Sequence, residues 1–199
     1  MTRMGVAQVL WDTFPKSKRL HGSKGIRRSS GIWMRHGGGW IPALKGRSNA
    51  RFHCTQHDML TAIEVANAYG VRFSLEHAWG ASNYIDEIVE SGCDVCYGRS
   101  EHTGAAGERR KVDIEAVKTL DERGVNVALI TDSPILSEES LYHHIGEAVR
   151  EGVPYLRALR MVTINPAHVL GVEDRVGTLR EGKDADLILV KGRPGLDTD

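Results

Sequence analysis

The sequence has 199 residues, of which 41% are hydrophobic and 26% charged, and its formal net charge is zero. This is the composition of a globular domain with a real core, and no apolar run approaches the roughly 20 residues of a membrane helix. Three cysteines (Cys54, Cys93 and Cys96) are too few for a disulfide framework, and the amino terminus lacks a secretory signal pattern. We therefore expect a cytoplasmic protein with no membrane partner.

Residues 1–50 differ in charge from the rest of the chain. They contain ten Lys or Arg and one acid, a net charge of +9, whereas the remainder contains sixteen bases and twenty-five acids. Residues 15–50 are rich in Gly, Ser, Lys and Arg and show neither the helical nor the strand period. We predict that 1–50 is a basic, poorly ordered segment. A nucleic-acid-binding arm and an organelle presequence are alternatives, although we expect no nucleic-acid partner.

From residue 51 onward, short strand patterns alternate with helical patterns. Strands are predicted at 51–54, 71–77, 93–98 and 125–131, and helices at 57–69, 82–91, 112–123, 138–151 and 154–161. Gly70, Gly92 and Gly124 each follow a helix as its stop signal, and Ser82 is placed to cap the second helix. The alternation predicts an α/β fold with a parallel sheet, about half of a (β/α)8 TIM barrel of roughly 250 residues.

Polar side chains stand at the ends of these predicted strands. His53 lies on the first strand, His77 ends the second, and Asp132 follows the fourth. In such barrels the active site lies at the carboxyl ends of the strands, so the three should converge. Two imidazoles and a carboxylate form a ligand set for zinc or a similar divalent ion. Each residue alone also has a structural interpretation, as a packed histidine or a helix-capping aspartate.

The remaining cysteines and histidines near these strands have simpler interpretations. Cys93 and Cys96 form a C-x-x-C pair, but at strand spacing they face opposite sides, so we interpret them as structural. Cys54 is interpreted as a buried small side chain. His57 competes with His53 as a metal ligand but is placed to start a helix.

Several motifs resemble the carboxyl-terminal half of the metal-dependent amidohydrolase superfamily, closest to its imidazolonepropionase-like members. The resemblance covers roughly residues 51–191, and residues 15–50 match nothing in that pattern. It rests on His53 with DMLTA (58–62), LEH (75–77), TD (131–132), TINPAHVLG (163–171) and DRVGTLREGKDADL (174–187). The last two motifs are long and specific, whereas none of the five identifies a substrate.

The resemblance implies a fold and a set of roles. Residues 51–171 would form strands five to eight of the TIM barrel, and 172–199 would begin a return into a small β-sandwich domain. His53 and His77 would bind the divalent metal, which we expect to be zinc, and Asp132 would bind it and handle the proton of the attacking water. The reaction implied is hydrolysis of a non-peptide C–N bond in a small-molecule substrate. Glu76 is a weaker candidate for a residue that supports the site. Arg99 and His102 are weaker candidates for substrate binding.

Two family features are missing from the sequence. The H-x-H motif of the first barrel strand does not occur, and the bridging Lys or Glu of the fourth strand is not identifiable. The alternative to an enzyme is therefore a truncated, non-catalytic half-barrel remnant, from a shortened or mis-framed gene. Half a barrel would leave two open sheet edges, so we also expect association, including a homo-oligomer.

Overall fold

The structure is a computed structural model that describes residues 43, 45–46, 49–98 and 112–197. Most of the basic segment predicted at 1–50 lies outside the described residues, as do Arg99 and His102. Four strands form one parallel sheet in the order β1-β2-β3-β4: β1 (Ala50–Cys54), β2 (Phe73–His77), β3 (Asp94–Gly98) and β4 (Val127–Ile130). The predicted parallel α/β sheet is confirmed.

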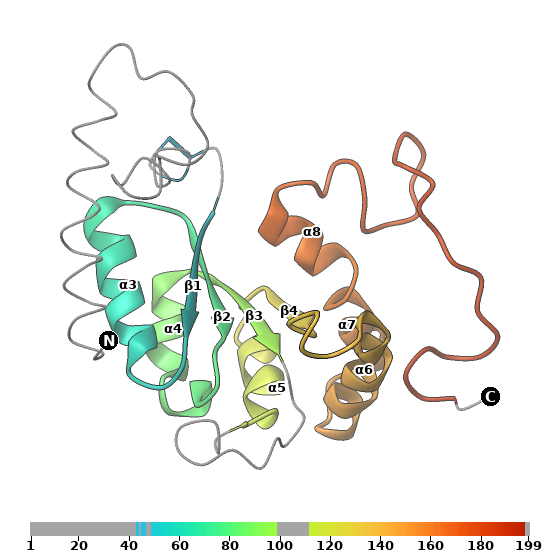
Figure 1. The fold of residues 1–199 in the computed structure, drawn as a ribbon, viewed down its shortest axis with the longest axis horizontal. Helices are drawn as coiled ribbons and strands as arrows, with labels where there is room; N and C mark the ends of the chain where they lie inside the picture. The colour runs from blue at the N-terminus through green and yellow to red at the C-terminus, as the bar shows by residue number, and fades with distance from the viewer. Residues whose placement is uncertain (1–42, 44, 47–48, 99–111, 198–199) are drawn as a thin grey trace.

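Helices follow each strand, as the alternation predicts. They are α3 (Asp58–Tyr69), α4 (Ile85–Ser91), α5 (Glu115–Glu122), α6 (Leu141–Arg150), α7 (Tyr155–Arg160) and α8 (Ile164–Leu170), with short 3-10 turns η2 (Ala81–Asn83) and η4 (Glu138–Ser140). Helices α3, α4 and α5 cover one face of the sheet, and α6 to α8 lie beyond β4 (Figure 1). Gly70 and Gly92 close α3 and α4 in the left-handed conformation that the sequence predicts.

The main core lies between the sheet and helices α3 to α5. Alternate strand residues, including Leu75, Val95 and Val127, are fully buried and pack with Met59 of α3 and Leu120 of α5. The intervening residues face the other side of the sheet because side chains alternate along a strand. On that second face, Cys96 and Ala128 pack with Val169 of α8.

The first turn of the second helix differs from the prediction. Helix α4 begins at Ile85, and Ser82 lies in η2 without a capping side-chain bond. Instead, the Ser82 backbone N–H donates to Asp113 Oδ2 at 2.8 Å. The turn is therefore held by a carboxylate 31 residues away, which a local capping pattern could not reveal.

The prediction of two open sheet edges is wrong for β4. Its outer edge is hydrogen-bonded: Leu129 N–H donates to Met161 O at 2.9 Å, and Asn165 Nδ2 donates to Val127 O at 2.7 Å. Edge peptide groups that are buried need such partners, and here the α7–α8 junction supplies them. On the outer edge of β1, by contrast, no strand of the described residues is paired.

The predicted start of a β-sandwich at 172–199 is not confirmed. Residues 172–197 contain neither helix nor strand, and Leu187, Ile188 and Leu189 are 63%, 72% and 99% exposed. A strand needs a hydrogen-bonding neighbour, and no described strand lies beside this segment. No helix within the described ranges is long and apolar enough to cross a bilayer.

Candidate metal centre at the strand ends

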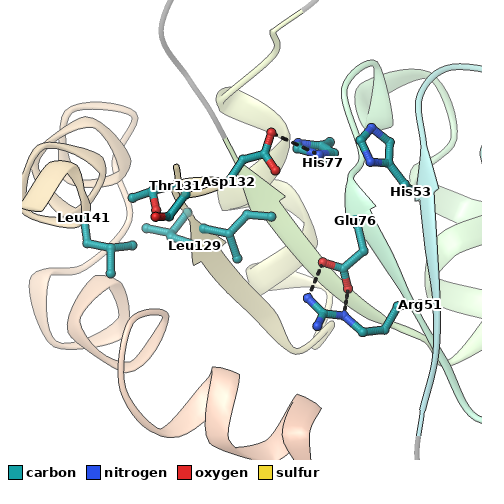
Figure 2. Close-up of a pocket in the computed structure, with 10 residues that line it drawn as sticks. Arg51, His53, Glu76, His77, Leu129, Thr131, Asp132 and Leu141 are labelled. Carbon is teal, nitrogen blue, oxygen red and sulfur yellow. Dashed lines mark hydrogen bonds and ion pairs between the residues drawn. The ribbon is translucent and has the colours of Figure 1, made fainter. Parts of the chain in front are cut away.

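The structure brings His53, His77 and Asp132 to one rim of the sheet. The His53 and His77 ring centroids are 4.1 Å apart, and His77 Nε2 lies 3.8 Å from Asp132 Oδ2. Figure 2 shows Asp132 and His77 pointing toward each other, with His53 beside His77. All three line a cavity of about 510 Å³, whose other lining residues are Arg51, Glu76, Leu129, Ile130, Thr131, Ser133 and Leu141.

Two of these residues have an unusual backbone. His77 and Asp132 are in the left-handed region, with φ of 66° and 57°, and Ala78 follows with φ of 51°. Side chains with a Cβ rarely adopt this conformation, and it persists only where the surrounding structure enforces it. Such residues cluster at functional sites, and His77 and Asp132 are two of the four described non-glycine residues with this backbone, beside Gln56 and Ala78.

The hydrogen bonding of His77 favours one tautomer. Its Nδ1 lies 3.4 Å from Gly98 O, which also accepts a 2.7 Å hydrogen bond from Trp79 Nε1. A carbonyl oxygen only accepts, so a hydrogen bond at this position requires the proton on Nδ1, and Nε2 faces the rim. A metal-binding histidine usually donates the N–H of its other ring nitrogen to a carboxylate, a water molecule or, as here, a backbone carbonyl.

The donor chemistry at the rim fits a divalent cation. Nε2 faces a carboxylate oxygen at 3.8 Å, and with the His77 proton on Nδ1 both atoms are acceptors, which repel unless a cation lies between them. Imidazole nitrogen and carboxylate oxygen are both zinc ligands. In the described part of the chain, no group of three or more His, Cys, Asp or Glu side chains is arranged to hold a metal ion. The ligand roles of His53, His77 and Asp132 remain predictions.

Below this rim, the second face of the sheet carries an ion pair. Arg51 donates through Nε and Nη2 to the two Glu76 carboxylate oxygens, each at 3.0 Å, and Ser74 Oγ donates to Oε1 at 2.7 Å. Burial alone would raise the pKa of Glu76, but the hydrogen bonds from Arg51 and Ser74 outweigh it and lower that pKa. Glu76 is thus an ionised, anchored wall of the cavity next to His77.

Sequence analysis did not identify Arg51 as a site residue. The available signal was spacing, because Arg51 and His53 are two residues apart on a strand and share a face. It also missed Trp79 and Asp113, which hold the turn after His77 through contacts distant in sequence. No local motif marks either residue.

The cysteines and His57 lie apart from the metal chemistry of the rim. All three cysteines are free and buried, and burial raises the pKa of each thiol, that of Cys93 to about 11. Thiols of this kind are protonated at neutral pH and are poor ligands, as their structural interpretation requires. His57 is the first residue before α3, and its Nδ1 lies 2.6 Å from Tyr84 OH, outside the cavity lining.

Comparison with solved structures supports a TIM-barrel-like fold. An amidohydrolase from Thermotoga maritima MSB8 superposes with a TM-score of 0.79 at 31% sequence identity, over 93% of this chain and 50% of that protein. The parallel sheet with its covering helices fits this fold, whereas the assignment of the strands as five to eight is not established by the superposition.

Relatives were also found by comparison of the sequence with curated proteins. A 5-methylthioadenosine/S-adenosylhomocysteine deaminase from Symbiobacterium thermophilum is 33% identical over 123 residues, 55% of this chain and 27% of that protein. An imidazolonepropionase from Thermoplasma acidophilum is 36% identical over 74 residues, 36% of this chain and 18% of that protein. The chain therefore spans less than a third of the length of these two relatives.

The family model described as "Amidohydrolase family" matches residues 37–198. The match begins at residue 37, earlier than the predicted start at residue 51, so the expectation that 15–50 matches nothing in the family is wrong for its last part. It also runs beyond the predicted end at 191, through residues 172–197, where the described chain has no strand. This match covers well over half of the sequence, and the chain belongs to the amidohydrolase family.

Proposed function

We propose that this chain forms strands five to eight of a metal-dependent amidohydrolase barrel and contributes to hydrolysis of a non-peptide C–N bond in a small molecule. Family membership supports the reaction class, as do relatives named as a deaminase and an imidazolonepropionase. The observation that carries the proposal is the His77–Asp132 pair, directed at a shared point from two left-handed strand ends.

In this proposal His53, His77 and Asp132 hold a divalent cation, with zinc favoured by the nitrogen and oxygen donors. When bound, such a cation supplies Lewis acidity, which lowers the pKa of water and polarises the scissile bond. Gly98 O fixes the His77 tautomer, so that its Nε2 is available as a neutral donor. Glu76 holds the Arg51 guanidinium beside the cavity through two hydrogen bonds of 3.0 Å.

Asp132 has the second role, in proton transfer. Its side chain is 36% exposed and lines the cavity, so it reaches both the rim and a molecule bound there. A carboxylate in this position accepts a proton from the attacking water and donates it to the leaving nitrogen. The proton thereby moves from water to the product amine, and Asp132 returns to its starting state.

We also propose roles for the surroundings of the site. Arg99 and His102 contact the substrate, the protein acts in the cytoplasm, and copies associate through the β1 edge, where the described sheet continues no further. Residues 172–199 begin the return toward a β-sandwich domain.

Metal analysis of the purified 199-residue chain tests the proposal. After removal of metal with a chelator, zinc titration should give one tightly bound equivalent, and His77→Ala should abolish it. His168→Ala is the matched control, because His168 lies on α8 and pairs with Glu173 at 3.0 Å, away from the cavity. A wild-type chain that is folded but binds no zinc contradicts the proposal, as does equal loss in both variants.

A further inference from the structure

The turn that follows His77 is conformationally unusual over several residues. His77, Ala78 and Gly80 have φ of 66°, 51° and 83°, so three of four consecutive residues are left-handed. Gly80 is also tightly packed, since a Cβ there would lie 2.5 Å from Gln56 Nε2. A turn of this kind persists only where other groups determine it, so its fixed points decide where the His77 side chain is directed.

The buried carboxylate of Asp113, just before α5, supplies those fixed points. Its Oδ1 accepts a hydrogen bond from the Gly80 N–H at 2.8 Å, and its Oδ2 accepts one from the Ser82 N–H at 2.8 Å. Asp113 is only 6% exposed, so these bonds are made away from competing water. One side chain therefore holds both backbone groups that end the turn.

Asp113 is itself anchored on the strand next to His77. Tyr97 OH donates to Asp113 Oδ1 at 3.1 Å and accepts from the Asp113 N–H at 2.9 Å. Tyr97 is fully buried and is the register partner of His77 across the β2–β3 pair. The chain of contacts thus runs from Asp113 back to the strand position beside the histidine.

We propose that Asp113 is a positioning residue, which holds the turn after β2 so that His77 keeps Nδ1 on Gly98 O and directs Nε2 to Asp132. The purpose of this device rests on the proposed function, because His77 is the proposed metal ligand. The geometry itself does not, because the protein alone makes the contact of His77 with Gly98 O and the hydrogen bonds that hold the following turn.

The imidazole nitrogens of His77 report this positioning directly. The full chain is labelled with ¹⁵N-histidine and studied by NMR without metal at about pH 8, above the ordinary pKa of histidine. Among the nine histidines, His77 is assigned by its absence in His77→Gln. We expect wild-type His77 to give two well-separated nitrogen signals, as a single tautomer protonated on Nδ1. In Asp113→Asn, the new NH2 group opposes a backbone N–H donor, and the two signals should move toward each other.

Asp94→Asn is the matched control at the other end of β3. The Asp94 carboxylate also joins separate segments, accepting hydrogen bonds from Asn49, Arg72 and Asn126. We expect this variant to lower the melting temperature and leave the His77 signals unchanged. If Asp113→Asn does not fold, Tyr97→Phe, which removes only the anchoring hydroxyl, must shift the His77 signals in the same direction.

Three results overturn the proposal. The first is a wild-type His77 that already exchanges between tautomers. The second is that the His77 signals do not shift in folded Asp113→Asn. If Asp113→Asn does not fold, unshifted His77 signals in Tyr97→Phe have the same meaning. The third is an equal shift in Asp94→Asn. Failure of the chain to bind zinc would contradict the proposed function and would leave this metal-free test unaffected.

Discussion

His77 Nε2 and Asp132 Oδ2 face each other at 3.8 Å across the end of β3, from strands that are not neighbours in the sheet. The distance exceeds that of a hydrogen bond, and both residues have left-handed backbone. The sheet thus places an imidazole and a carboxylate opposite each other at its carboxyl end, with the His53 ring tilted by 51° against that of His77 at a centroid distance of 4.1 Å.

Removal of either facing group should weaken metal binding more than removal of an outer partner. Loss of an outer-shell hydrogen bond costs about 10–100-fold in affinity, and loss of a ligand costs more. We expect His77→Asn and Asp132→Asn each to raise the zinc dissociation constant by more than about 100-fold, as measured by competition with a chromophoric chelator. Zinc affinity within tenfold of wild type in either variant would show that its side chain is not a ligand.

The Arg51–Glu76 pair should stabilise the fold in a pH-dependent manner. The pKa of Glu76 is lowered in the folded state, so its contribution is present above the unfolded pKa and is lost as the pH falls through the folded pKa. We expect Glu76→Gln to destabilise the fold by about 1–3 kcal/mol at neutral pH. Urea unfolding measured from neutral pH downward should show the two proteins converging as the pH falls through the lowered, folded-state pKa of Glu76, since below it Glu76 is protonated in both states. A difference that is constant with pH would mean that the effect is one of packing alone.

The core between the sheet and α5 should be sensitive to truncation. Leu120 is fully buried, whereas Leu156 on α7 is 73% exposed. Leu120→Ala should lower the free energy of unfolding by about 2–5 kcal/mol, and Leu156→Ala should change it by no more than about 0.5 kcal/mol. Chemical denaturation of the two variants compares the same substitution at the two sites. Similar losses in both would contradict the placement of the core.

The covered β4 edge gives a further prediction. Asn165 Nδ2 donates to Val127 O at 2.7 Å, and Asn165 is 9% exposed. Asn165→Ala leaves that carbonyl without its donor, so we expect a loss of about 1–3 kcal/mol and faster hydrogen exchange of the Leu129 amide. Asn67→Ala, on the exposed face of α3, is the control and should leave exchange along β4 unchanged. Unchanged β4 exchange in Asn165→Ala would show that the edge is held by other contacts.

The helices and strands that have a clear local hydrophobic period could be predicted from the sequence. Alternation along 71–77 and the helical period of 57–69 placed β2 and α3 to within two residues, because both patterns record which face is buried. The approximate positions of His77 and Asp132 followed, since side chains after parallel strands meet at one edge.

The remaining features depend on contacts between distant residues. Nothing near Ser82 indicates that Asp113 holds its N–H, and nothing near Val127 indicates that Asn165 covers the edge of β4. The apolar run in 184–191 has the composition of a strand, but strand formation also requires a neighbour, and periodicity carries no information about that neighbour.

The most direct test of the central claim is the position of a bound metal. Crystals of the full chain grown with zinc, with anomalous diffraction recorded at the zinc edge, locate the ion independently of any ligand assignment. The account predicts one strong peak about 2.0–2.2 Å from both His77 Nε2 and an Asp132 carboxylate oxygen. A fully occupied zinc site that contacts neither residue, or a folded chain that takes up no zinc at this rim, would contradict it.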